Sequence, residues 1–428
     1  MRKSKVTAVS LATALSPLWG IAAWLAGPLP APADEVPFTE IELSAPAGPR
    51  DVYAADLDGD GDIDILFASS VPGNHKIGWY QSNGGLPVTF TGEIVISTTA
   101  LDVTSVFAAD VDGDGNTDVL SASPGDHKIA WYKNDGALFP PTFTEQVIST
   151  NALGARSVFA ADLDGDGDID VLSASDIDSK LAWYENDGES PPSFTERVIA
   201  TDIIPFGPRS LFATDLDGDG DIDVLTASLG TAAAPGTAWY ENDGESSPNF
   251  TKRVITSTRA ISVYAADMDR DGHIDILSGS NSLGGIKWHE NDGDSPPTFT
   301  EHPIAPNNDY IPTSMFTMDM DLDGDTDVLV ATLSAHFVWY DSSGGFPPTF
   351  IERDLVSHAS TDESAFGADL DGDGDIDVLW AGKVFTERFA KIKMYINLLP
   401  RTAGDMDRDG DVDLQDYALF QEVFTGPF

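Results

Sequence analysis

The sequence predicts an all-β fold, a seven-bladed β-propeller of four-stranded antiparallel blades followed by a small C-terminal calcium-loop and helix element. Three observations carry this prediction. An aspartate- and glycine-rich motif recurs seven times at steps of 50 to 54 residues, with its first aspartate at Asp56, Asp110, Asp162, Asp215, Asp267, Asp319 and Asp369. Four short apolar runs recur with it, and a run missing from the last repeat is present near the N-terminus. Repeats of this length are typical of radially arranged blades.

The four apolar runs of each repeat are clearest in the third, where they are "SVFAADL", "DIDVLSAS", "KLAWYEND" and "FTERVIA". They are rich in β-branched and aromatic residues and are separated by Asp, Gly and Pro, which predicts four short strands. A sheet that is apolar on both faces is not stable alone. Seven such sheets around an axis bury these faces against one another.

Tryptophans mark the third predicted strand in six repeats: Trp79, Trp131, Trp183, Trp239, Trp288 and Trp339. We interpret them as packing between blades. A platform on which a ligand stacks is the alternative that the residues leave open.

The ends of the repeat array predict how the ring closes. The seventh repeat has three runs, "AFGADL", "DIDVLWAG" and "KIKMYINL", but no element like "FTERVIA" after them. The matching element is "FTEIEL" at residues 38–43. We therefore expect an N-terminal strand to complete the last blade, which removes open sheet edges and favours a ring over an open solenoid.

The aspartate loop has the spacing of a calcium ligand set. In the third repeat, side-chain oxygens stand at positions 1, 3 and 5 (Asp162, Asp164, Asp166), Gly167 at position 6 permits a sharp turn, and Asp170 is at position 9. Position 7, Asp168, would offer its backbone carbonyl. An EF-hand-type loop surrounds calcium with this spacing. Calcium suits such an all-protein oxygen cage better than magnesium does, and a solvated acidic turn without metal is the alternative.

All seven loops keep Asp at positions 1, 3, 5 and 9 and Gly at position 6. Position 7 varies, as a backbone ligand allows, and position 4 is Arg270 or Leu322 in two loops, so glycine there is interpreted as dispensable. The predicted ligands besides the third loop are Asp56, Asp58, Asp60, Asp62 and Asp64; Asp110, Asp112, Asp114, Asn116 and Asp118; Asp215, Asp217, Asp219, Asp221 and Asp223; Asp267, Asp269, Asp271, His273 and Asp275; Asp319, Asp321, Asp323, Asp325 and Asp327; and Asp369, Asp371, Asp373, Asp375 and Asp377.

The charge of the chain fits cation binding and argues against nucleic acid or anionic lipid as a partner. The chain of 428 residues has 71 acidic and 23 basic residues, a formal net charge of −48. It contains no cysteine, which excludes disulfides and thiol redox chemistry. Stability must then come from core packing or from metal.

The first 33 residues are predicted to be a signal peptide. Arg2, Lys3 and Lys5 precede an apolar run, and Ala31-Pro32-Ala33 matches a small-x-small cleavage site. We therefore expect a secreted or cell-surface protein with the propeller at residues 34–400. The long apolar run leaves an uncleaved membrane anchor as the alternative.

The repeat "SVFAADLDGDGDIDVLSAS" and its copies resemble the FG-GAP/VCBS repeats of integrin α-chain propellers and secreted bacterial proteins, over about residues 38–400. This resemblance implies a loop that joins the two innermost strands of a blade and binds calcium on one face. The glycine-rich "FG…GAP" motif of the family is reduced to "AFGAD" in the last repeat, which places this chain nearer the bacterial VCBS type. An integrin-like partner is therefore not expected.

Residues 401–428 contain one more calcium-type loop. Its predicted ligands are Asp405, Asp407, Asp409, Asp411, Asp413 and Asp416, which bring the total to about eight calcium sites. The apolar residues after it have helical spacing. The segment resembles half of a dockerin, which implies a cohesin-like partner at the C-terminus. Since a dockerin has two such segments, a structural calcium-bound cap is the alternative.

We expect a non-catalytic, calcium-stabilised binding or adhesion module for a glycan or an extracellular protein. The chain has no G-x-S-x-G or H-E-x-x-H motif, and no catalytic residue is predicted. The alternative function is that of a polysaccharide lyase or sugar dehydratase, which the resemblance to secreted propellers leaves open.

The face opposite the aspartate loops is expected to hold the ligand, because the repeats differ most there. Six residues before the first aspartate, at the predicted mouth of the central channel, three repeats have Arg50, Arg156 and Arg209. These arginines could bind a carboxylated or sulfated sugar. The alternative is that each pairs with an acidic residue of the next blade.

Overall fold

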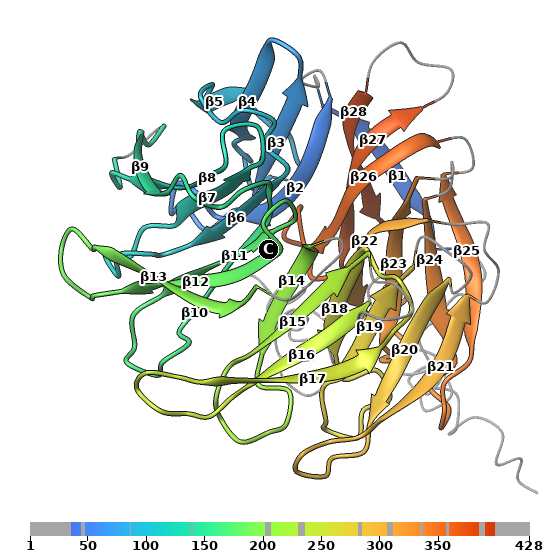
Figure 1. The fold of residues 1–428 in the computed structure, drawn as a ribbon. Helices are drawn as coiled ribbons and strands as arrows, with labels where there is room; N and C mark the ends of the chain where they lie inside the picture. Colours follow the sequence, from blue (N-terminus) through green and yellow to red (C-terminus); the bar gives the residue numbers. More distant parts are fainter. Residues whose placement is uncertain are drawn as a thin grey trace, which may run out of the picture. The chain divides into compact units, whose positions relative to one another are not determined.

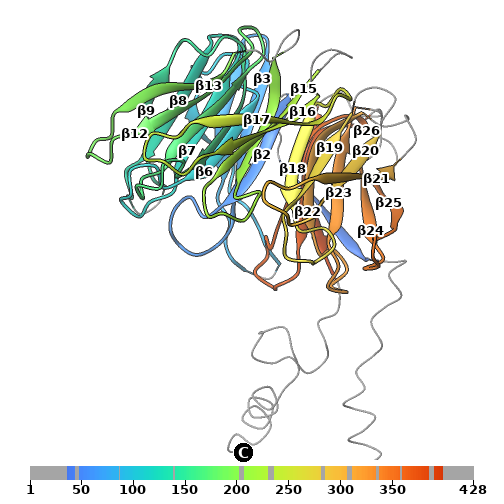
Figure 2. The same ribbon diagram turned by 60° about the horizontal axis from the view of Figure 1, so that its bottom comes forward.

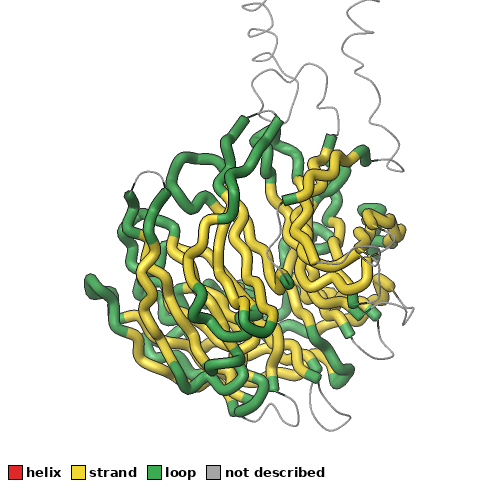
Figure 3. The backbone as a smooth tube through the Cα atoms, turned by 90° about the horizontal axis from the view of Figure 1, so that it is seen from above, coloured by secondary structure: helices red, strands yellow, loops and turns green. Residues whose placement is uncertain are grey.

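The computed structural model describes residues 36–43, 48–85, 87–137, 140–201, 207–229, 236–280, 285–305, 311–333, 337–356, 359–384 and 390–398. The predicted signal peptide or anchor, the C-terminal calcium loop and the central parts of the most variable loops lie outside these residues. The described residues form strands, turns and loops without a helix (Figure 3), and thus none that could span a membrane.

The residues from Phe38 to Asn397 form seven four-stranded antiparallel sheets around a common centre (Figures 1 and 2). From the innermost strand outward, the first three blades are β2 (Pro49–Ala55), β3 (Asp64–Val71), β4 (Asn74–Tyr80), β5 (Ile94–Ser97); β6 (Ser105–Ala109), β7 (Asp118–Ser123), β8 (Lys128–Asn134), β9 (Phe143–Ser149); and β10 (Ala155–Ala161), β11 (Asp170–Ser175), β12 (Lys180–Asn186), β13 (Phe194–Ala200).

The next three blades repeat this order: β14 (Pro208–Thr214), β15 (Asp223–Ser228), β16 (Thr237–Asn242), β17 (Phe250–Thr256); β18 (Ser262–Ala266), β19 (Asp275–Gly279), β20 (Ile286–Asn291), β21 (Phe299–Ala305); and β22 (Pro312–Met318), β23 (Asp327–Thr332), β24 (Phe337–Ser342), β25 (Phe350–Val356). The seventh comprises β26 (Ala359–Ala368), β27 (Asp377–Val384), β28 (Ala390–Asn397) and the N-terminal β1 (Phe38–Glu42). The predicted fold class is confirmed.

The N-terminal strand closes the ring as the sequence predicts. β1 pairs antiparallel with β28, from Phe38 opposite Asn397 to Glu42 opposite Lys393. An ion pair adds to this ladder, because the Lys393 ammonium lies 2.8 Å from a carboxylate oxygen of Glu40. The outer strand of the last blade and its three inner strands thus come from opposite ends of the repeat array.

The core lies between neighbouring blades. The cluster between the first two blades contains Trp79 and Leu66 of one blade with Val119 and Tyr132 of the next. The six repeated tryptophans are at most 4% exposed, which confirms that they pack between blades. The second strand of each blade is the most enclosed, and every residue of β11 is buried. Neither face of these strands is exposed to solvent, as expected for a sheet that is covered on both sides.

The innermost strands bring seven aromatic side chains into a closed circle: Tyr53, Phe107, Phe159, Phe212, Tyr264, Phe316 and Phe366. Each ring contacts both of its neighbours, with centroids 4.6 to 5.5 Å apart. Each of these residues stands three positions before the first aspartate of its loop. The aromatic circle therefore lines the central channel midway between the aspartate loops and the opposite ends of the innermost strands.

Candidate metal loops and the central cavity

Each aspartate loop joins the innermost strand of a blade to the second strand, and its backbone turns twice through left-handed conformations. In the third loop Gly165 and Gly167 have φ values of 72° and 98°. A side chain would meet no atom within 4 Å at either position, so conformation, not space, selects glycine. Arg270 and Leu322 at position 4 also have positive φ, of 62° and 57°. Our interpretation of that glycine as dispensable was incomplete, since the left-handed turn is kept and disfavours other residues.

The aspartate at position 1 organises the loop through its backbone. One carboxylate oxygen of Asp162 accepts hydrogen bonds from the amides of Gly165 (2.9 Å) and Asp166 (3.2 Å), and the other accepts one from Gly167 (3.0 Å). At position 5, Asp166 accepts a hydrogen bond from the amide of Asp168 (3.0 Å). The loop therefore has its curvature built from its own amides and carboxylates.

The aspartate at position 9 has a structural role that the sequence analysis missed. Asp170 is 1% exposed, and its two oxygens accept hydrogen bonds from the amides of Leu163 (3.0 Å) and Asn186 (2.8 Å). It thereby clamps the loop to the end of the third strand. Burial raises the pKa of Asp170 to about 7. The same two-amide clamp is made by Asp64, Asp118, Asp223, Asp275, Asp327 and Asp377.

An asparagine at the end of the third strand joins the loops of adjacent blades. The side-chain amide of Asn186 donates to the carbonyl of Ile169 in its own loop (3.0 Å) and to that of Val111 in the preceding loop (2.9 Å). Four other blades repeat this contact through Asn134, Asn242, Asn291 and Asn397. Ser82 and Ser342 stand at this position in the other two. The repeated "ND" after the aromatic pair is the sequence signal that could have revealed it.

The side chain at position 7 lies against the turn that follows the third strand. A Cβ atom at Gly188 would be 2.1 Å from a carboxylate oxygen of Asp168, and the same crowding involves His273 at Gly293. The glycine of this turn thus makes room for whichever residue occupies position 7. A metal-binding role of the position-7 carbonyl remains a prediction.

The loops gather carboxylates as a hard divalent cation requires. Seven groups of three acidic side chains have ligand atoms within 4.8 Å of one another in the described residues, for example Asp56, Asp58 and Asp64. A buried oxygen at position 3 (Oδ1 of Asp58, Asp164 and Asp217) has no hydrogen-bond partner. Burial and then the charge of the position-5 aspartate raise the pKa of each of these three carboxyls. Orphaned, mutually repelling oxygens fit a calcium ligand set.

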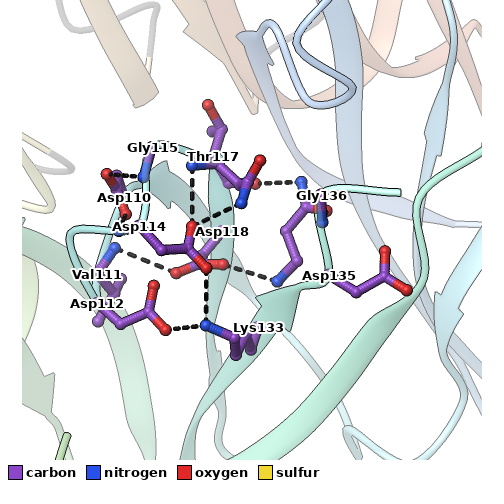
Figure 4. A network of polar contacts seen from close by, with 12 residues as sticks. Asp110, Val111, Asp112, Asp114, Gly115, Thr117, Asp118, Lys133, Asp135 and Gly136 are labelled. Carbon is purple, nitrogen blue, oxygen red and sulfur yellow. Dashed lines mark hydrogen bonds and ion pairs between the residues drawn. The ribbon is translucent and has the colours of Figure 1, made fainter. Parts of the chain in front are cut away.

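The second loop differs because the protein supplies a cation to its position-3 and position-5 carboxylates (Figure 4). The ammonium of Lys133, from the end of the third strand, contacts the carboxylate of Asp112 and lies 2.8 Å from that of Asp114. Although burial opposes both shifts, these hydrogen bonds hold the pKa of Asp114 below its ordinary value and raise that of Lys133. In the first loop a neutral group takes this place, as the Gln81 amide donates to Asp58 (2.6 Å).

The opposite ends of the innermost strands surround a central cavity of about 430 Å³. The aromatic circle forms its floor, and Arg50, Arg156 and Arg209 line it. Arg156 donates from Nε to Asp176 (2.7 Å), and a terminal nitrogen of Arg209 lies 3.7 Å from the same oxygen. The predicted arginines thus meet at one cavity, and two of them share an acid in the turn between β11 and β12. Nothing in the local sequence marked Asp176 for this role.

A model of the FG-GAP-like repeat matches residues 56–121, 110–173, 162–226, 267–330 and 319–380. No curated protein matches the chain. Among solved structures, a crystal structure of BBS1N in complex with ARL6DN, soaked with lead, is similar with a TM-score of 0.53 and 14% identity, covering 85% of this chain and 96% of that one. The structural similarity concerns the fold alone. The repeat matches span most of the ring, and the chain therefore belongs to the family of FG-GAP-like repeat proteins.

Proposed function

We propose that the protein is an exported binding module in which calcium at the aspartate loops stabilises the propeller and the central cavity receives a glycan or protein ligand. The observation that carries this proposal is the different use of the two ends of the innermost strands. One end repeats the same ligand geometry in every blade, as a structural site must. The other end opens into a cavity whose outermost wall position differs between blades, with arginine in three of them.

The loops would hold calcium through the carboxylates at positions 1, 3 and 5. The aspartate at position 9, which belongs to the same groups in the first, second and fourth loops, also fixes the loop to the sheet. The calcium would neutralise the charge that these aspartates bring together. The protein's own contribution is the preformed turn, shown by the amides that converge on Asp162. Export by residues 1–33 and a cohesin-like partner for residues 401–428 belong to the same proposal and rest on the sequence.

A binding screen on glycans and extracellular proteins, with and without EGTA, tests the proposal. Saturable binding that calcium supports is the expected result. A Ser157→Trp variant should lose it, because Ser157 lines the cavity and a large side chain there fills the space. Ser193→Trp, at an exposed site outside the cavity, is the matched control. Equal binding by both variants contradicts a ligand site in the cavity.

The alternative function, a polysaccharide lyase or sugar dehydratase, predicts a chemical product instead. No contact among the described residues favours it over binding. Incubation with acidic polysaccharides separates the two functions, because a lyase releases unsaturated sugar while a binding module leaves the polymer intact.

A further inference from the structure

The central cavity lies at one end of the innermost strands. Its lining comes from the first residues of these strands and ends at the aromatic circle, while the alanines that follow toward the aspartate loops, such as Ala54 and Ala108, do not line it. A ligand in this cavity therefore contacts the aromatic rings on one side and the first residues of the strands around it.

The wall of the cavity carries three arginines and one carboxylate, that of Asp51, which is an excess of positive charge in a strongly acidic protein. Arg156 and Arg209 share the single carboxylate of Asp176. Because both guanidinium groups lie against one carboxylate oxygen, their charges are close to each other, and burial and then Arg156 lower the pKa of Arg209. An anion placed between them relieves this repulsion and accepts charge-assisted hydrogen bonds. Asp176 holds the pair in position from one side.

The remaining wall includes serine hydroxyls. Two of them accept hydrogen bonds from amides of the next blade, which leaves their own hydrogens free to be donated. Directly above the aromatic floor, six blades place a serine at the same register position: Ser105, Ser157, Ser210, Ser262, Ser314 and Ser364. Hydroxyls around an aromatic floor suit a ligand that has both apolar ring faces and many hydroxyl groups, as a sugar has. A peptide end offers fewer hydroxyls to such a wall.

We propose that the cavity binds a sugar that bears a carboxylate or sulfate, with its anionic group between Arg156 and Arg209. The inference rests on the proposed binding function and names the ligand class for it. Arg50, which lines the same cavity, adds positive charge to the wall.

Calorimetric titration with trigalacturonate tests this proposal, with its fully methyl-esterified form as a neutral ligand of nearly the same shape. The acid should bind and the ester should bind at least about tenfold more weakly, as expected when a hydrogen bond to a charged group is lost. Arg209→Gln should weaken binding of the acid by about the same factor. Asp176→Asn should strengthen it, because the arginines then lack a competing carboxylate.

Lys287→Gln is the matched control, since it removes one cation from a surface ion pair with Glu301. Equal binding of acid and ester, or equal effects of Arg209→Gln and Lys287→Gln, overturns the proposal. If Arg209→Gln lowers the melting temperature, Asp176→Asn decides alone, and unchanged or weaker binding by it is the contradicting result.

Two further arms separate this proposal from the broader binding function. A sulfated disaccharide should compete with trigalacturonate for the cavity. Binding of a peptide through its terminal carboxylate, without binding of either acidic sugar, overturns the sugar assignment and leaves the binding function intact. Absence of any ligand in the glycan and protein screen overturns both.

Discussion

The two ends of the innermost strands follow opposite rules. At one end seven loops repeat the same aspartates and the same clamp, from Asp64 in the first blade to Asp377 in the last. At the other end the outermost position of each innermost strand changes from blade to blade, with arginine at residues 50, 156 and 209 and Thr, Ile or Glu at the equivalent positions. Uniform geometry indicates a requirement shared by every blade, whereas variation within a shared cavity indicates selection for one ligand.

One exception at each end makes the comparison testable. Lys133 brings a cation to the carboxylates at positions 3 and 5 of the second loop, whereas the other cation at a loop, Arg270, contacts the position-7 side chain of Asp325. Asp51 stands where the other six blades place serine, and it accepts hydrogen bonds from the Val106 amide (2.9 Å) and the Ser364 hydroxyl (2.8 Å).

The largest loss of stability is expected when the position-9 aspartate, which clamps a loop to the third strand, is replaced. This loss should occur even without metal. Asp170→Ala leaves two buried amides without an acceptor and should lower the free energy of unfolding by about 3 kcal/mol or more in EGTA. Asp164→Ala in the same loop is the control, because its buried oxygen has no partner to lose. The Asp164→Ala substitution should lower the free energy of unfolding only in calcium. Chemical denaturation in both buffers measures this, and equal losses in EGTA contradict the division of roles.

Asp51 should make the free energy of unfolding depend on pH, whereas the serines at the same position in the other blades should not. Burial raises its pKa from 3.8 to about 6. The stabilisation from its protonated form is thus present below about pH 4 and is lost as the pH rises through 6. Relative to Asp51→Ser, wild type should lose about 3 kcal/mol between pH 4 and 7. The Ser105→Ala variant, compared in the same way, should show no such trend; a flat difference for Asp51→Ser contradicts the shift.

The next largest loss of stability is expected when the asparagine that joins the loops of adjacent blades is replaced. Asn186→Ala removes two buried hydrogen bonds that join the second and third loops, which should cost about 2 kcal/mol. Asn249→Ala, at an exposed site, should change stability by less than about 0.5 kcal/mol. Urea denaturation compares them. Similar midpoints for the two variants would mean that the loops are held independently.

The smallest effect concerns the affinity of single loops. Lys133→Gln should strengthen calcium binding at the second loop on the order of tenfold, because a nearby positive charge is removed. Gln81→Lys should weaken the first loop similarly. Native mass spectrometry at limiting calcium should show one more bound ion in the former and one fewer in the latter. Unchanged occupancy in both would show that Lys133 lies outside the influence of the site.

The sequence predicted the blades, the ring closure and the acidic loops, because each is repeated at a constant period. The N-terminal strand could be predicted because the seventh repeat lacks its fourth apolar run and "FTEIEL" supplies a matching one. The pairing of Arg156 and Arg209 with Asp176 could not be predicted, because it forms across two blades and occurs once. The clamp role of Asp170 was hidden because the same spacing also suits a metal ligand, and only its buried position separates the two roles. The aromatic circle had a visible signal, one aromatic residue three positions before each loop.

The central claim, that calcium at the aspartate loops holds the ring together, is tested most directly by thermal melting in calcium, in EGTA, and in EGTA with excess magnesium. Even modest sites stabilise by about 1 kcal/mol each when calcium exceeds the dissociation constant about tenfold. Seven such sites should raise the melting temperature by on the order of 10 °C or more, and magnesium should restore little of it. Equal melting temperatures in calcium and EGTA would contradict the claim.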